Sequence, residues 1–278
     1  MSLSIGFLDK LCFKLKKSPI QEKITELEGK IDENPLFSFA SAKNPENQID
    51  GVHFKEIDTD TWNRKQIFDL FSSNENPFCS VTARNDISKF LKTTKKKHIP
   101  DSHAMLYMLS KTANEIPEFK QRVVNGKVIE YDKVGITATV AKKDGSFNIQ
   151  PLEYMENPTE FLQQTSKKIQ AAKTREDLFA PKEEWQTGDN VVYSTCLPWM
   201  DFTSLTHPIS NNKTDFIPRI AWGKYTKNKK ETTIPVNIEA NHSLVDGFHI
   251  AQFFQKLQNN LDNASEIFKS INKYDALK

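Results

Sequence analysis

The sequence predicts an α/β fold in which helices cover a mixed β-sheet. Segments with strand-like and helix-like patterns alternate from Val52 to the last strong helix, which ends near Leu261. Many of the links between them suit hairpins, which favours a mixed sheet over a doubly wound parallel one. The chain has 278 residues, 37% hydrophobic and 10% aromatic, which is enough to enclose a core without a disulfide or a metal ion.

The first fifty residues differ from the rest of the chain. Apolar residues at helical spacing within residues 7–17 predict a short amphipathic helix, which would either pack on its own protein or lie on an anionic membrane. A Ser-Pro pair opens a second predicted helix, residues 18–28, and the polar stretch 38–51 is typical of a linker. We therefore expect two regions, a helical extension and linker over residues 1–50 and one domain over residues 51–278.

From Val52 onward the predicted elements follow in order. Runs rich in β-branched and aromatic residues predict strands, at 53–57, 78–83, 134–141, 191–196, 217–222 and 232–240. Apolar residues three and four positions apart predict helices, at 59–71, 87–91, 103–114, 158–173 and 248–261. Asn125-Gly126, inside the run 123–129, predicts a hairpin with a type I′ turn. The lysine-rich run 92–97 resembles a phosphate-binding patch, although we expect it to be a solvated loop.

Composition argues against several classes of protein. The 38 basic and 36 acidic side chains leave a net charge of +2, which gives no electrostatic reason to expect a nucleic-acid partner. The three cysteines lie far apart and form no C-x-x-C motif, which argues against a disulfide framework or a thiolate zinc site. No apolar run approaches the ~20 residues of a membrane span, and no secretory signal is recognisable. We expect a cytoplasmic protein without a membrane span.

One histidine, His242, stands in a pattern that suits catalysis. It follows the predicted strand 232–240 and opens the motif His-x-x-x-Asp-Gly, which ends at Asp246 and Gly247 just before a predicted helix. A turn between a strand and a helix can present one imidazole to a cleft. The unperturbed pKa of an imidazole lies near neutrality, which suits a general base. On these residues alone, a structural histidine in a turn is the commoner case.

Four further segments, taken together with that motif, resemble the chloramphenicol acetyltransferase family. They are Asp-Thr-Trp-Asn-Arg-Lys at 60–65, Ile-Pro-Glu-Phe at 116–119 with the hairpin after it, Leu-Pro-Trp-Met-Asp-Phe-Thr-Ser at 197–204, and Gly-Lys-Tyr at 223–225. These segments resemble the family in order and spacing from Val52 to Leu261. The acyltransferase cores of 2-oxo acid dehydrogenases are similar only in the shorter His-x-x-x-Asp-Gly motif.

The resemblance implies a two-layer α/β sandwich of the coenzyme A-dependent acyltransferase type, with acetyl-CoA as co-substrate, a small hydroxyl-bearing acceptor and no metal. It makes His242 the general base for the acceptor hydroxyl and Ser204 the hydroxyl that hydrogen-bonds the tetrahedral oxyanion. In the family the carboxylate that matches Asp246 pairs with the arginine that matches Arg64. These two residues are therefore expected to support the turn rather than to complete a catalytic triad.

The resemblance also concerns the coenzyme and the assembly. Lys224 and Tyr225 match positions that line the family's coenzyme A channel, where a cation can meet phosphates. The family likeness further implies a homotrimer with an active site at each subunit interface, where His242 of one chain faces a pocket of its neighbour.

The departures from the family pattern concern the acceptor pocket. Cys79 stands where the family carries a tyrosine, and Val140 ends a stretch, 137–140, that lacks the family's aromatics. Ala221 replaces a threonine that is common in the family. One aromatic contact contributes on the order of 1 kcal/mol beyond its buried area. We therefore expect chloramphenicol to be a weak acceptor and a smaller or more polar alcohol to be a better one.

Two other functional hypotheses are consistent with parts of the sequence. An acyltransferase core of a multienzyme complex would carry a lipoyl domain and an Ala/Pro-rich linker, and we find neither in this sequence. A catalytically silent binding or scaffold protein would use the N-terminal arm as its working part. The retention of both His242 and Ser204 argues against that hypothesis.

Overall fold

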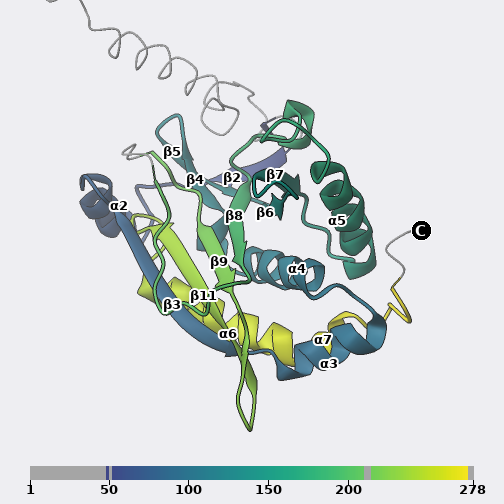
Figure 1. Ribbon diagram of the computed structural model, residues 1–278. Helices are drawn as coiled ribbons and strands as arrows, with labels where there is room; N and C mark the ends of the chain where they lie inside the picture. The colour runs from purple at the N-terminus through teal and green to yellow at the C-terminus, as the bar shows by residue number, and fades with distance from the viewer. Residues whose placement is uncertain (1–47, 50–51, 210–213, 275–278) are drawn as a thin grey trace, which may run out of the picture. The chain divides into compact units, whose positions relative to one another are not determined.

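The computed structural model describes residues 48–49, 52–209 and 214–274 (Figure 1). All of them fall within one unit of the chain, residues 42–278. The helices predicted in the first 47 residues lie outside the described residues.

The larger sheet carries the candidate site and mixes parallel with antiparallel pairs. Its strand order is β10 (Thr226–Lys227), β11 (Thr232–Asn241), β9 (Arg219–Gly223), β8 (Val191–Leu197), β6 (Gly135–Ala141) and β7 (Phe147–Leu152), with β3 (Phe78–Asp86) paired to the other edge of β11. β8 runs parallel to β6 and β9, whereas the other pairs are antiparallel. The predicted mixed sheet is therefore confirmed. β7 is missing from the sequence-based prediction, and it forms because a turn at Gly145 (φ 86°) folds it back onto β6.

A smaller antiparallel sheet is formed by four other strands. Its order is β1 (Gln48–Ile49), β2 (Val52–Glu56), β5 (Lys127–Tyr131) and β4 (Gln121–Val124). The β4–β5 hairpin confirms the predicted turn, since Asn125 and Gly126 have φ of 52° and 77°, as a type I′ turn requires. β1 lies within the stretch predicted as a linker, so strand pairing begins before residue 51.

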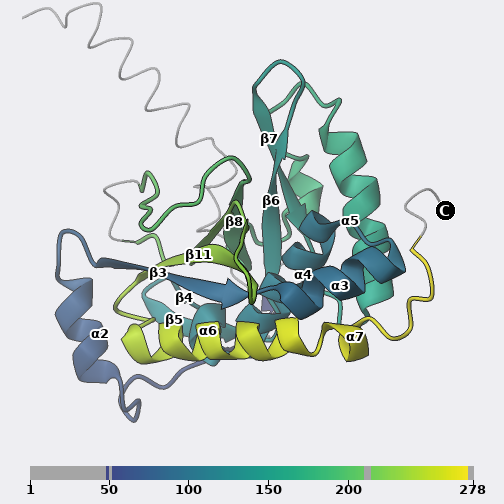
Figure 2. The same ribbon diagram turned by 60° about the horizontal axis from the view of Figure 1, so that its bottom comes forward.

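Helices form the second layer, which confirms the predicted sheet covered by helices. α4 (Asp101–Asn114) and α6 (Gly247–Asp262) pack together, and their Met108, Leu109 and Phe253 are fully buried in the core. α2 (Lys65–Ser72) lies beside the N-terminal end of α6 (Figure 2). The other helical segments are α3 (Ser88–Lys97), α5 (Pro158–Ala172), α7 (Ala264–Ile267), η1 (Pro117–Lys120) and η2 (Lys182–Glu184).

The lysine-rich run 92–97 is helical, so the expectation of a loop there is wrong. α3 continues to Lys97 because Thr93 and Thr94 are buried on its inner face. Three lysines in its last turn lie at the negative end of the helix dipole, which stabilises the helix. His98 then ends α3 in the left-handed conformation, with φ of 58°.

The helix predicted at 59–71 begins only at Lys65. Ahead of it, the Asp58 carboxylate accepts hydrogen bonds from the backbone N–H of Asp60 and from the hydroxyl of Thr61, which closes a turn instead of opening a helix. Arg64 is therefore the last residue before α2, and its side chain reaches the turn that carries His242.

Candidate active site

His242 lies in the turn between β11 and α6. Its backbone N–H donates to the carbonyl of Pro77, 2.7 Å away, which directly precedes β3. Its ring stacks on Phe71 of α2 with 3.9 Å between ring centroids and 23° between planes. Its Nδ1 is buried and has no hydrogen-bond partner among the described residues. The position of the imidazole is thus set by the backbone and by Phe71 rather than by a carboxylate.

Arg64 and Asp246, which are expected to support the turn, do meet in the structure. Arg64 Nη1 forms an ion pair with one carboxylate oxygen of Asp246, and Arg64 Nη2 donates to the carbonyl of Ser243 at 3.3 Å. The other oxygen of Asp246 accepts the N–H of Phe248 at 3.0 Å and caps α6. Burial raises the pKa of the Asp246 carboxyl, but the hydrogen bond from Arg64 and the charges of His249 and Arg64 outweigh burial and hold that pKa below its usual range. Both oxygens of Asp246 are therefore engaged in holding the turn.

His249 joins the same cluster, and sequence reasoning missed its role. It is 7% exposed, and its Nδ1 accepts the backbone N–H of Asp246 at 3.1 Å. The available signal was its place at the third residue of α6, where a side chain that accepts from the N-cap backbone completes a capping box.

The loop that follows β8 is held against the larger sheet by a close backbone approach. A Cβ added to Gly223 would lie 2.9 Å from the ring of Phe202 and would also overlap the carbonyl of Met200. The next residue, Lys224, donates its backbone N–H to that same carbonyl at 2.7 Å. Only glycine fits at position 223, which is why the Gly-Lys-Tyr motif and the loop with Ser204 belong together.

Ser204 is exposed on this loop, one residue before a polar anchor. The carbonyl of Leu205 accepts hydrogen bonds from Ser80 Oγ of β3 at 2.8 Å and from Asn237 Nδ2 of β11 at 3.1 Å. Two residues later, the His207 backbone N–H and Nδ1 contact the Glu239 carboxylate, also on β11. The loop therefore follows β11 in the direction of His242, with Ser204 at the far end.

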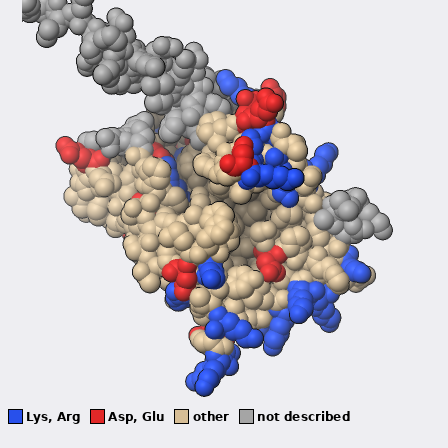
Figure 3. Space-filling view, in the orientation of Figure 1, with Lys and Arg blue, Asp and Glu red and all other residues tan. Residues whose placement is uncertain are grey.

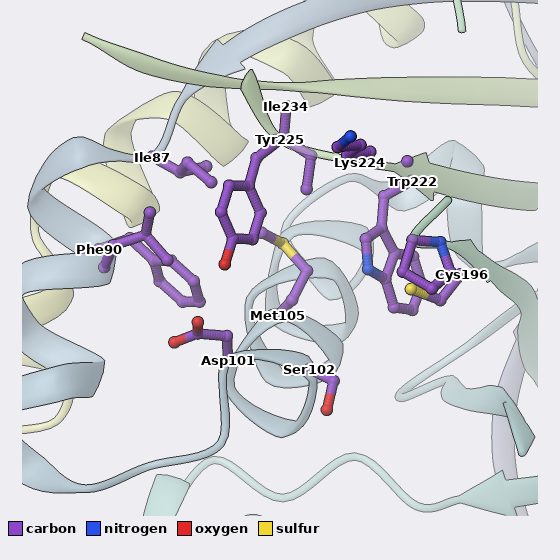
Figure 4. Close-up of a pocket in the computed structure, with 13 residues that line it drawn as sticks. Ile87, Phe90, Asp101, Ser102, Met105, Cys196, Trp222, Lys224, Tyr225 and Ile234 are labelled. Carbon is purple, nitrogen blue, oxygen red and sulfur yellow. The ribbon is translucent and has the colours of Figure 1, made fainter. Parts of the chain in front are cut away.

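A cavity of about 430 Å³ is lined by Lys224 and Tyr225. Most of its wall is apolar and comes from α3, α4 and the ends of β8 and β9. In Figure 4 the Tyr225 ring projects between Phe90 and Trp222, and its hydroxyl points toward Asp101. Lys224 and Tyr225 therefore line the same cavity, and their role at coenzyme A stays a prediction.

The three residues that depart from the family pattern lie at different places in the structure. Val140 is 5% exposed and belongs to the hydrophobic core. Side chains alternate between the two faces of β6, and Val140 lies on the face that is turned inward. The two-residue repeat in the sequence does not show which of the two faces is buried. The Cys79 thiol lies 3.6 Å from the carbonyl of Ala240 and faces the inside of the turn, and burial raises its pKa to about 11. Ala221 is buried on β9 and pairs with Asn237.

Comparisons with known proteins show the family of this chain. The family model described as chloramphenicol acetyltransferase matches residues 52–258, which span the turn, the loop and the cavity. The chain belongs to the chloramphenicol acetyltransferase family. Among curated members, chloramphenicol acetyltransferase 2 of Haemophilus influenzae is 27% identical over 216 residues, which cover 76% of this chain and 99% of that protein. The chloramphenicol acetyltransferase of Clostridium perfringens is 29% identical over 213 residues, which cover 74% of this chain and 94% of that protein.

Solved structures give the same result. A chloramphenicol acetyltransferase superposes with a TM-score of 0.70 at 25% identity, covering 75% of this chain and 99% of that one. A dihydrolipoamide acetyltransferase from Azotobacter vinelandii, with a TM-score of 0.53 at 15% identity, covers 73% of this chain and 88% of that one and shares the fold. This member of the chloramphenicol acetyltransferase family is therefore an acyltransferase, of a family that uses acetyl-CoA as co-substrate.

Two observations concern metals and membranes. Within residues 48–49, 52–209 and 214–274, no group of three histidine, cysteine, aspartate or glutamate side chains is placed to hold a metal ion. In the same part of the chain, no helix is long and apolar enough to cross a membrane.

Proposed function

We propose that this protein transfers the acetyl group of acetyl-CoA to the hydroxyl of chloramphenicol or a related small alcohol, with His242 as general base. His242 takes the hydroxyl proton as the alcohol oxygen attacks the thioester carbonyl. The carbon–sulfur bond then breaks, the ester forms, and the proton passes to the leaving sulfur of coenzyme A. The observation that carries this proposal is the His242 turn, in which Asp246 is fully engaged by Arg64 and α6 and the imidazole stacks on Phe71.

Ser204 supplies the hydroxyl that stabilises the tetrahedral oxyanion. Leu205, next to it, lies beside Asn237, which is five residues before His242 on β11. At ~3.3 Å per residue this separates the two places by about 16 Å along the strand. Because one tetrahedral centre needs both groups at hydrogen-bond distance, we infer that the Ser204 and the His242 of one site come from different copies of the chain.

The exposed apolar side chains support such an assembly, a homotrimer with three interface sites. Phe248 and Leu70, which are 68% and 60% exposed, lie in α6 and α2 beside the His242 turn. Trp199 and Met200, which are 73% and 56% exposed, lie in the loop that carries Ser204. Two different apolar patches on one chain suit a head-to-tail interface, which closes into a ring.

The cavity at Lys224 and Tyr225 is the proposed place for coenzyme A. Its apolar wall suits an uncharged arm of the coenzyme, and cations around it suit the phosphates. Lysines gather over α3 and over the hairpin of β10 and β11 (Figure 3). Both elements border the cavity, because Phe90 of α3 and Ile234 of β11 line it.

The surroundings of the Ser204 loop favour a small polar acceptor. Asn237 Nδ2 donates to the hydroxyls of Ser80 and Thr82, at 2.8 and 3.0 Å, and the Oδ1 of Asn237 is buried with no partner among the described residues. The exposed hydroxyl of Ser80 makes this face polar, and a hydroxyl-bearing ligand suits such a face better than an aromatic ring does.

A complementation experiment tests the proposal. His242→Ala and Ser204→Ala chains are each expected to be nearly inactive in a thiol-release assay with acetyl-CoA and a panel of alcohols. When the two chains are co-expressed, about a quarter of the randomly formed interfaces hold both intact residues, so activity should return to about that fraction. Activity of either variant alone at the normal rate removes its residue from the mechanism. A wild-type protein that releases no thiol with any acceptor is instead a catalytically silent scaffold.

A further inference from the structure

His249 holds the N-terminal end of α6 in a way that an ordinary capping residue does not. Its Nδ1 accepts the backbone N–H of Asp246, while the Asp246 carboxylate accepts the N–H of Phe248. Glutamate or glutamine is the usual third residue of such a capping box, and it needs only one oxygen for this task. An imidazole has a second nitrogen, which is free to contact another group.

The second nitrogen of His249 faces Glu118. Nε2 of His249 lies 3.4 Å from Oε1 of Glu118 in η1. η1 is fixed on α6 because Phe119 and Phe253 stack with 5.0 Å between their ring centroids. Since Nδ1 acts as an acceptor, a neutral His249 carries its proton on Nε2, and this proton faces the carboxylate. His249 therefore links the capped end of α6 to η1.

The charges around His249 come from three elements. Glu118 belongs to η1, Arg64 precedes α2, and Asp246 and His242 belong to the turn. Burial lowers the pKa of His249, the charges of Arg64 and His242 lower it further, and Glu118 and Asp246 oppose that shift without cancelling it. The neutral form is thus the favoured one, and it is the form that can accept the N–H of Asp246.

We propose that His249 and Glu118 are positioning residues for His242, an inference that rests on His242 being the general base. Only a neutral His249 can accept the backbone N–H of Asp246. In a protonated ring, Nδ1 carries a hydrogen and faces that N–H as a second donor. The Nδ1–H then competes for the Asp246 oxygen that lies 3.3 Å away and that caps α6. The turn 242–246 then loses its hold on α6, and the imidazole of His242 loses its orientation.

The pH profile of kcat/KM for acetyl transfer tests this role. On the acid side, a plot of log kcat/KM against pH for the wild-type protein is expected to steepen toward a slope of about two, because His242 and His249 must both be neutral. His249→Gln keeps an acceptor at the capping position and does not titrate, so its acid limb should have a slope of about one, with kcat at pH 8 within about threefold of wild type. Glu118→Gln removes a charge that favours protonated His249, so the second inflection should move to lower pH.

A kcat and KM comparison gives a second readout. His249→Ala removes the acceptor and should lower kcat by about 10- to 100-fold, as a misplaced catalytic group does, with the KM for acetyl-CoA within about twofold. The matched control is His103→Gln in α4, because burial also lowers the pKa of His103, which falls to about 4. The control should keep the wild-type kcat and the slope of about two.

Two results would overturn the proposal. One is an acid limb of the same slope in wild type and His249→Gln. The other is a His249→Gln variant that loses as much kcat as His249→Ala. If His249→Ala does not fold, the profile of His249→Gln decides the question by itself. A His242→Ala variant with normal activity contradicts the proposed function instead, whereas an inactive His242→Ala with unchanged slopes contradicts only the role of His249 and Glu118.

Discussion

At the scale of single residues, the two side chains proposed for the chemistry have different surroundings. His242 is half-buried against Phe71, and its Nδ1 has no partner among the described residues. Ser204 is exposed on a loop that is anchored one residue later by Leu205. A base needs a fixed orientation, whereas an oxyanion donor needs an open approach, and the two surroundings match these needs.

Removing either side chain should lower turnover without preventing folding. His242→Ala should reduce kcat by about 10²- to 10⁴-fold, the usual contribution of a general base. Ser204→Ala should cost about 10²- to 10³-fold through the lost oxyanion donor. Thr203→Ala, one position earlier in the same loop and also exposed, serves as the control and should leave kcat unchanged. Steady-state rates of thiol release from acetyl-CoA measure all three.

The acceptor preference is a second property set by single residues. The Ser204 loop rests on two polar side chains, Asn237 and Ser80. We therefore expect the KM for chloramphenicol to exceed the KM for the best small polar alcohol by about 10-fold or more. A 10-fold difference corresponds to about 1.4 kcal/mol of binding free energy. Steady-state kinetics with both acceptors measure the ratio. A low micromolar KM for chloramphenicol would contradict the expectation, because it would show a pocket that binds the aromatic ring well.

At the scale of elements, the site depends on how α2, β11 and α6 are joined. Arg64 is 7% exposed, and it connects the start of α2 to Asp246 at the start of α6. The attraction within such a buried pair adds little to the free energy of unfolding. Removing one partner lowers that free energy much more, because the other charge is left without a partner in a poorly hydrated place.

Breaking this pair should lower stability and activity together. Arg64→Ala and Asp246→Asn should each cost about 3 kcal/mol of unfolding free energy, which corresponds to a Tm lower by roughly 6–12 °C. The matched control is Lys65→Ala, which breaks an ion pair to Asp69 whose partners are 43% and 53% exposed and should change stability by less than about 1 kcal/mol. Thermal denaturation with an activity assay on the same samples tests the role, and lost activity with an unchanged Tm contradicts it.

At the scale of the whole molecule, the two parts of the proposed site, the His242 turn and the Ser204 loop, lie at separate places on one chain. The His242 turn is bordered by exposed Phe248, and the Ser204 loop by exposed Trp199. Covering these rings by neighbouring copies would remove apolar surface from water and would complete each site at the same time.

Light scattering at micromolar concentration should therefore give three times the 31.9 kDa of one chain. Phe248→Glu and Trp199→Glu each place a charge in the proposed interface, so both should give smaller species with reduced activity. Phe147→Glu changes an aromatic that is 49% exposed at the start of β7, outside both patches, and it should remain trimeric. A monomeric wild-type protein contradicts the proposed assembly.

What the sequence determined by itself is what depends on near neighbours in the chain. Period-two and helical patterns predict most of the strands and helices, and Asn125-Gly126 predicts its turn, because each is set by local backbone preferences. Even there, α3 runs on through the lysines that suggest a loop, since the burial of Thr93 and Thr94 depends on distant segments. The spacing from His242 to Asp246 is likewise local, and the resemblance that it carries is confirmed by the family match.

Only the tertiary structure decided which distant residues share the site. It brings Arg64 to Asp246 and Glu118 to His249, turns Val140 into the core, and anchors the loop of Ser204 to Asn237 of β11 through Leu205. Each of these results depends on strand order, on register and on the face that each strand buries. A shift of one residue in register reverses those faces, and no local pattern records the choice, because it is made by the packing of the whole core.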